Sequence, residues 1–140
     1  VKRAYSNFIN AAVEKIGTDA LSLRIIVEGL PVDILKSFKG VTVIEQHPTG
    51  IEIETPRYRK LTHLLTEMAL EGANFIEISG NDDIMLSANS KLPYNESLFS
   101  VSRQGYGDQR HLIEIKVKML AEWIRKNDIS QLHLEHIFDY

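Results

Sequence analysis

The sequence contains no cysteine. This absence excludes disulfide bonds, zinc–thiolate sites, iron–sulfur clusters and thiol nucleophiles. It leaves the compartment unknown, because a chain without cysteine suits an oxidising environment and a reducing one equally. The chain begins with Val1 rather than methionine. We therefore expect a processed or trimmed product, compatible with an exported or membrane-anchored soluble domain.

Positive charge is also scarce. Lysine and arginine together number 16 against 19 acidic residues, which gives a formal net charge of -3. Such a balance offers no general attraction to nucleic acid or to anionic membranes. No apolar run approaches the length that a membrane span requires, so we expect no membrane insertion by this segment. With 44% hydrophobic residues, however, the chain can bury a real core.

The motifs of common enzyme classes are missing as well. There is no Gly-x-Ser-x-Gly elbow for a serine nucleophile. The Gly105-Tyr106-Gly107 segment is too short for a phosphate-binding loop and is typical of a hairpin tip. The segment 80–83 lacks the alternating carboxylates and terminal Glu of a calcium loop and indicates a turn. These absences favour a non-enzymatic protein with no cofactor and no tightly bound metal.

What the chain does contain is one pattern that occurs twice. Residues 51–78 begin with Ile51-Glu52-Ile53, continue with a helical run and end in a short apolar strand. Residues 113–137 begin with Ile113-Glu114-Ile115 and follow the same order. Strand alternation and helical spacing are both clear in each copy. The repeat predicts a tandem α+β architecture.

The first lobe is predicted over residues 20–88. Strand and helix signals from residue 21 to residue 79 follow the order β-α-β-β-α-β, with the second helix capped by Thr55 and begun by Pro56. This order is that of the ferredoxin-like, split βαβ arrangement. A strand over residues 84–88 is grouped with this lobe. We expect antiparallel sheets with helices on one face.

The remaining segments complete the predicted organisation. Residues 1–19 indicate an N-terminal amphipathic helix or connector, because the apolar residues of 3–16 follow helical spacing. Residues 89–96 are expected to form a loop. Residues 97–140 are predicted to form a second, partial lobe that packs on the first. Together with the strand at 84–88, its elements follow the order β-β-β-α-β, which is the order of the first lobe without its first helix.

One row of polar residues on the last predicted strand is a candidate metal site. His133, Glu135 and Asp139 share one face because side chains alternate, and such a set can bind a divalent ion. The alternative is a solvated sheet face, which we favour because a metal site needs converging ligands and a supporting shell. His136 is expected on the opposite face, as a hydrogen-bonded core histidine.

Two further residues are candidates for ligand or partner contacts. Tyr106 lies between two glycines at a hairpin tip, where an exposed aromatic ring can contact a partner. Gly29 separates the first strand from the first helix of a β-α-β-β-α-β unit over residues 21–79. In this respect the unit resembles amino-acid-binding ACT domains, although its loop reads Glu28-Gly29-Leu30-Pro31, without that family's acidic residue and Pro-Gly pair. The resemblance implies a small ligand bound beside the Gly29 loop.

The sequence therefore favours a non-catalytic binding or interaction module of a larger protein. The first hypothesis is a protein-interaction or self-association module that acts through an exposed strand edge or sheet face. The alternative is a ligand-sensing regulatory domain of ACT-like type. A metal-dependent enzyme is the least favoured hypothesis. The candidate contact residues are Gly29, Tyr106, His133 and Glu135.

Overall fold

The computed structural model describes residues 22–127 and 132–138. Within these residues the chain forms two antiparallel four-stranded sheets and three helices, so the α+β class is confirmed. The segment 1–19, with its expected amphipathic helix, and Asp139 lie outside the described residues.

The first sheet, sheet A, is formed by the first half of the chain. Its strand order is β2-β3-β1-β4, with α2 between β1 and β2 and α3 between β3 and β4. Apolar side chains alternate with polar ones along the central strand, as a sheet with one buried face requires. The elements are β1 (Ser22–Glu28), α2 (Val32–Ser37), β2 (Thr42–His47), β3 (Gly50–Pro56), α3 (Arg59–Leu70) and β4 (Asn74–Ile78).

The second sheet, sheet B, repeats this order strand for strand. Its order is β6-β7-β5-β8, so β5 occupies the place of β1. No helix lies between β5 and β6, as the sequence predicted for the second copy. The strand expected at residues 84–88 was grouped with the first lobe, but it pairs with β7 and β8 in sheet B. The elements are β5 (Asp83–Ser90), β6 (Phe99–Arg103), β7 (Asp108–Lys116), α4 (Val117–Asn127) and β8 (His133–Phe138).

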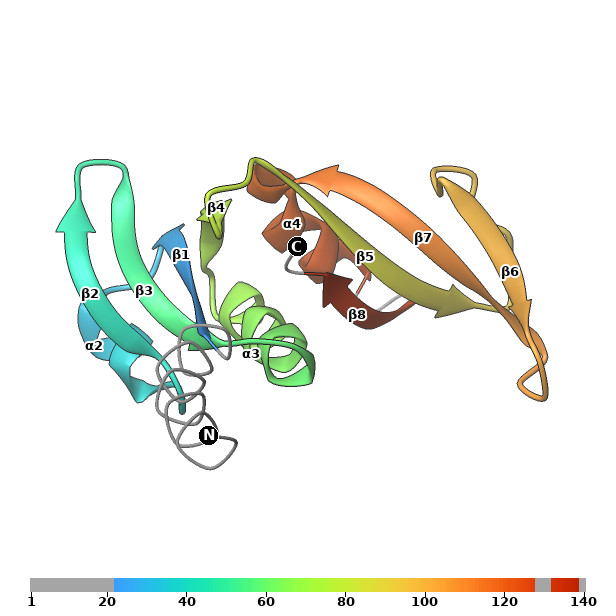
Figure 1. Cartoon of the computed structure of the whole chain (residues 1–140), viewed down its shortest axis with the longest axis horizontal. Coiled ribbons are helices and arrows are strands. Elements are labelled where there is room, and N and C mark those ends of the chain that lie inside the picture. Colours follow the sequence, from blue (N-terminus) through green and yellow to red (C-terminus); the bar gives the residue numbers. More distant parts are fainter. Residues whose placement is uncertain (1–21, 128–131, 139–140) are drawn as a thin grey trace, which may run out of the picture.

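The two halves share one hydrophobic core. Helices α3 and α4 lie between the sheets and pack against each other (Figure 1). Arg125 of α4 adds a polar connection, because its Nη1 donates to the carbonyl oxygens of Ala69 and Ala73 at 2.9 and 3.0 Å. None of the helices in the described residues is long and apolar enough to cross a membrane. The largest fully buried side chains come from both halves and include Ile25, Met68, Phe75, Leu86, Leu120 and Ile137.

The start of α3 differs from the sequence prediction. Thr55 was expected to cap this helix and Pro56 to begin it, but both belong to β3. Thr55 continues the inward alternation of Ile51 and Ile53 and is buried, so its hydroxyl is not available as a cap. The helix begins at Arg59 instead, after Tyr58, whose φ of +66° makes the sharp turn out of the strand.

Candidate functional site

The four candidate residues do not form one site. Gly29 lies in the turn after β1 of sheet A, whereas Tyr106 lies at the tip of the β6–β7 hairpin of sheet B. His133 and Glu135 lie on β8, as predicted. Strands β1 and β6 lie in different halves of the molecule, far from each other (Figure 1), so the turn after β1 and the β6–β7 hairpin tip do not form one ligand site.

Gly29 has a structural reason to be glycine. Its φ is +94°, which side chains other than glycine rarely adopt, and a Cβ there would lie 2.5 Å from the carbonyl oxygen of Gly72. The loop is therefore packed directly against the backbone that follows α3. This close approach accounts for the glycine without a ligand.

Glu135 lies in a network of hydrogen bonds rather than in an open metal site. Arg110 Nε and Nη2 donate to its two carboxylate oxygens, each at 2.7 Å, and Ser87 Oγ donates to Oε1 at 2.8 Å. The hydrogen bond from Arg110 holds the pKa of Glu135 below its ordinary value, against the opposing effect of partial burial. Both carboxylate oxygens already accept hydrogen bonds. Glu135 is therefore engaged in an ion pair with Arg110, here called closed because neither oxygen is left without a donor.

The position predicted for His136 was wrong. The pairing of β5 with β8 shifts register between Ser87 and Ala88, which pair with His136 and Leu134 respectively. This bulge at Glu135 breaks the period-two alternation on which the prediction rested. His136 therefore lies half-buried with Phe138, at an edge-to-face ring distance of 4.7 Å, instead of in the core.

The surface that carries this ion pair is the face of sheet B turned away from the helices, here called the outer face of sheet B. It contains a shallow hollow of about 240 Å³. Apolar side chains surround the Arg110–Glu135 pair, so the surface is apolar around a closed polar centre. The residues that line the hollow are Ser87, Phe99, Val101, Leu112, Glu135, His136 and Phe138, with Arg110.

Strand β6 borders this face and is an open sheet edge. Phe99 and Val101 are 57% and 47% exposed, and Tyr106 at the adjacent hairpin tip is 68% exposed. Arg103 stacks on the Tyr106 ring, with its Cζ 4.2 Å from the centroid. The pairing of β6 with β7 contains no bulge. Among the described residues, the edge strands β4 and β8 contact α4 and α3 and β2 contacts the short helix α2, whereas β6 contacts no helix to a comparable extent.

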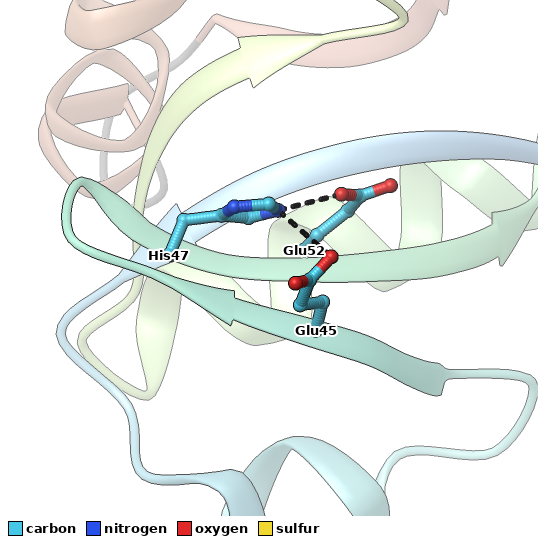
Figure 2. Close-up of side chains that lie close together, drawn as sticks. All are labelled: Glu45, His47 and Glu52. Carbon is cyan, nitrogen blue, oxygen red and sulfur yellow. Dashed lines mark hydrogen bonds and ion pairs between the residues drawn. The ribbon is translucent and has the colours of Figure 1, made fainter.

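Sheet A carries a different cluster on its open edge. His47 of β2 lies with its Nε2 2.7 Å from Glu52 Oε1 and 4.0 Å from Glu45 Oε2 (Figure 2). Arg24 Nη1 donates to the other oxygen of Glu52 at 3.1 Å. The hydrogen bond with His47 is the largest cause that lowers the pKa of Glu52. These side chains form the one group of three or more potential metal ligands found among the described residues.

The sequence analysis did not find His111, which is fully buried in β7. Its Nε2 lies 2.7 Å from Ser90 Oγ and its Nδ1 lies 2.6 Å from Ser100 Oγ. A serine beside a histidine suggests a nucleophile and its base. No substrate can reach the Ser90–His111 pair, however, because both residues are buried, whereas Ser100 is exposed and its hydroxyl also bonds to Ser97. The histidine instead connects β5, β7 and β6 across the sheet.

A larger cavity lies in sheet A. It has a volume of about 750 Å³ and opens between the β2 end of the sheet and α3. Thr55 lines it, is 1% exposed, and its Oγ1 has no hydrogen-bond partner in the described residues. Other lining side chains carry charges of both signs, namely Lys39, Glu54, Lys60 and Glu67.

Comparisons with known proteins do not assign a function. No protein-family model, no curated protein and no solved structure matches the chain. The function therefore has to be argued from the chemistry and exposure of the surfaces described above.

Proposed function

We propose that the chain is a non-catalytic interaction module that associates with a second copy of itself through β6 and the outer face of sheet B. The observation that carries this proposal is the exposure of Phe99 and Val101 on an open edge strand without a bulge. An exposed apolar edge is a template for pairing with another strand. Natural proteins protect such edges unless pairing is their function.

The sequence of β6 supports a second copy as the partner. In an antiparallel pair centred on Val101, Phe99 of one copy faces Arg103 of the other and Ser100 faces Ser102. No like charges meet, and an aromatic ring beside a guanidinium is a favourable cross-strand pair. A two-fold axis through Val101 therefore joins two four-stranded sheets into one with a continuous outer face.

Two matched variants test this proposal. Val101→Lys places a charge at the centre of the proposed interface, and Ile44→Lys places the same charge on β2, the open edge of sheet A, where Ile44 is 38% exposed. Sedimentation equilibrium should give a dimer for the native chain and for Ile44→Lys, and a monomer for Val101→Lys. A native chain that stays monomeric at all concentrations overturns the proposal, and so does a Val101→Lys variant that remains dimeric.

The proposal includes the finer fold assignment. The order β-α-β-β-α-β with β3 and β4 flanking β1 supports a ferredoxin-like lobe, and sheet B supports a partial copy of it. Because β5 pairs within sheet B, we place the division between the lobes at the turn before Asp83. In this assignment the second copy has lost its first helix, and residues 91–98 connect β5 directly to the interaction strand.

One observation favours a second candidate function, the binding of a small ligand in the cavity of sheet A. A buried hydroxyl without a partner, such as that of Thr55, is costly unless something bonds to it. Lysine and glutamate side chains around the same cavity suit a small molecule that carries both a carboxylate and an amino group. A thermal-shift screen with amino acids should then raise the unfolding temperature of the native chain and not of Thr55→Val.

A further inference from the structure

The starting observation is a bulge in the outermost pair of strands of sheet A. Strand β2 pairs Val43 with Ile53, but the next pair is Glu45 with Glu52, so Ile44 has no partner. Without this extra residue, Ile44 would face Glu52. Bulges re-aim side chains, and this one brings a second carboxylate opposite the first.

Two carboxylates directly opposite each other on neighbouring strands repel and destabilise the sheet. A cation between them removes this cost. His47 is placed to be a further ligand of such a cation. It lies two residues after Glu45 on the same strand, and its ring nitrogen points between the two carboxylates (Figure 2). The bulge thus brings together three side chains. They offer two classes of metal-ligand atom, the carboxylate oxygen and the imidazole nitrogen.

The spacing of these atoms suits a transition-metal ion. The three ligand atoms all lie within 4.8 Å of one another. In a tetrahedral zinc site, ligands about 2.1 Å from the ion lie roughly 3.4 Å from each other. The separations of His47 Nε2 from Glu52 and Glu45 oxygens, 2.7 and 4.0 Å, fall on either side of that value. Small side-chain rotations are enough to equalise them.

Arg24 gives the site a supporting contact. It donates to Oε2 of Glu52 at 3.1 Å, so that Oε1 remains directed at His47. Hydrogen bonds of this kind orient ligating carboxylates in metal sites. The side chain of Glu52 is 17% exposed and that of Glu45 is 67% exposed. The pre-oriented ligands are therefore His47 and Glu52, and Glu45 closes the site from the solvent side.

We propose that Glu45, His47 and Glu52 bind one divalent first-row transition ion, with Zn²⁺ as the best-fitting ion and water in the fourth position. Imidazole favours such an ion over Ca²⁺ and Mg²⁺, which prefer sets of oxygen ligands. The ion takes the place of the hydrogen bond between His47 Nε2 and Glu52 Oε1. The sequence analysis expected no tightly bound metal and did not single out these three residues, which the bulge brings together. The site lies at the opposite end of the molecule from β6 and is independent of the proposed self-association.

Titration of the metal-free full chain with ZnCl₂ by isothermal calorimetry tests the site. We expect one ion per chain and a zinc-dependent rise in the thermal unfolding midpoint. His47→Ala and Glu52→Gln should each weaken zinc binding by more than about tenfold. Glu54→Gln is the matched control, because Glu54 lies on the same strand and face but bonds to Ser22. It should bind zinc like the native chain.

Two results overturn the proposal. One is the absence of saturable zinc binding by the native chain. The other is stoichiometric binding that persists in both His47→Ala and Glu52→Gln, which would place the ion elsewhere. Glu45→Gln provides a variant that is safe for folding, because the side chain is mostly exposed, and it should weaken binding without lowering the stability of the metal-free protein.

Discussion

The two sheets share one strand order but differ at their open edges. Strand β2 of sheet A carries Glu45 and His47 and contains a bulge, which are features that discourage pairing with another strand. Strand β6 of sheet B has a regular register and exposes Phe99 and Val101. These edges lie at opposite ends of the molecule (Figure 1). One edge is thus protected, and the other is open to a partner.

The outer faces of the two sheets also differ, in how polar they are. The outer face of sheet A is charged, with Arg24 bonded to Glu52 and Ser22 bonded to Glu54. The outer face of sheet B is apolar around the Arg110–Glu135 pair. A repeated scaffold therefore carries two different surfaces. When two halves of a molecule repeat one strand order, function is therefore better sought where the halves differ than where they agree.

The comparison assumes that the two halves fold as one body, and matched core substitutions test this assumption. Ile25→Ala and Leu86→Ala remove fully buried side chains from the central strands β1 and β5. Each should cost about 2–5 kcal/mol of unfolding free energy. Because the core is shared, chemical denaturation should show a single transition for both variants. Two separate transitions would show that the sheets unfold independently.

A smaller effect is expected from the polar group inside sheet B. Strand β3 presents Ile51 towards the interior, whereas β7 presents the buried His111. His111→Ala leaves the hydroxyls of Ser90 and Ser100 without this partner and should cost about 1–3 kcal/mol in unfolding free energy.

Additional removal of both hydroxyls, by Ser90→Ala and Ser100→Ala, should change the stability little further, because their bonds to the ring are already lost and Ser100 is exposed to solvent. Urea denaturation of the single and triple variants measures the difference. If the triple variant is less stable than His111→Ala alone, the histidine network is not the source of the loss.

The smallest effect concerns pH. Glu135 in sheet B and Glu52 in sheet A both have a lowered pKa, caused mainly by hydrogen bonds with Arg110 and His47 respectively. A lowered folded-state pKa contributes stability that is present above the ordinary pKa of glutamate and is lost as the pH falls through the folded-state pKa. Glu135→Gln should therefore lower stability at neutral pH, and this difference should vanish in acid.

Glu52→Gln should behave in the same direction with a smaller amplitude, because the exposed Arg24 donates one hydrogen bond to Glu52, whereas Arg110 donates two to Glu135. Unfolding midpoints from pH 7 down to pH 3 measure both variants. A stability difference that grows in acid would contradict the assigned directions of the pKa shifts.

Periodicity and turn residues were sufficient to predict most elements. The helix expected within residues 113–137 is α4, and the strands before and after it lie in one sheet. Trp123, on the apolar stripe of this helix, packs partly buried against the core, with Nε1 donating to Tyr94 Oη at 3.3 Å. These features depend on local spacing, which a sequence displays directly.

Two bulges account for what the sequence could not predict about the candidate sites. The bulge at Glu135 moved His136 to the outer face, and the bulge at Ile44 brought Glu45 opposite Glu52. A bulge adds one residue to one strand, and only the partner strand reveals it. His111 was missed for a similar reason, because only the pairing of β7 with β5 and β6 brings its two serine partners to it from 21 and 11 residues away.

The most direct test of the proposed difference between the edges is amide hydrogen exchange at increasing protein concentration. Pairing of β6 with a second copy protects its outward amides, so exchange at residues 100–102 should slow as the concentration rises. Exchange at residues 44–46 of β2 should not change, because the bulge and the charges keep that edge unpaired. Exchange at residues 100–102 that is independent of concentration, or equal slowing at both edges, would contradict the account.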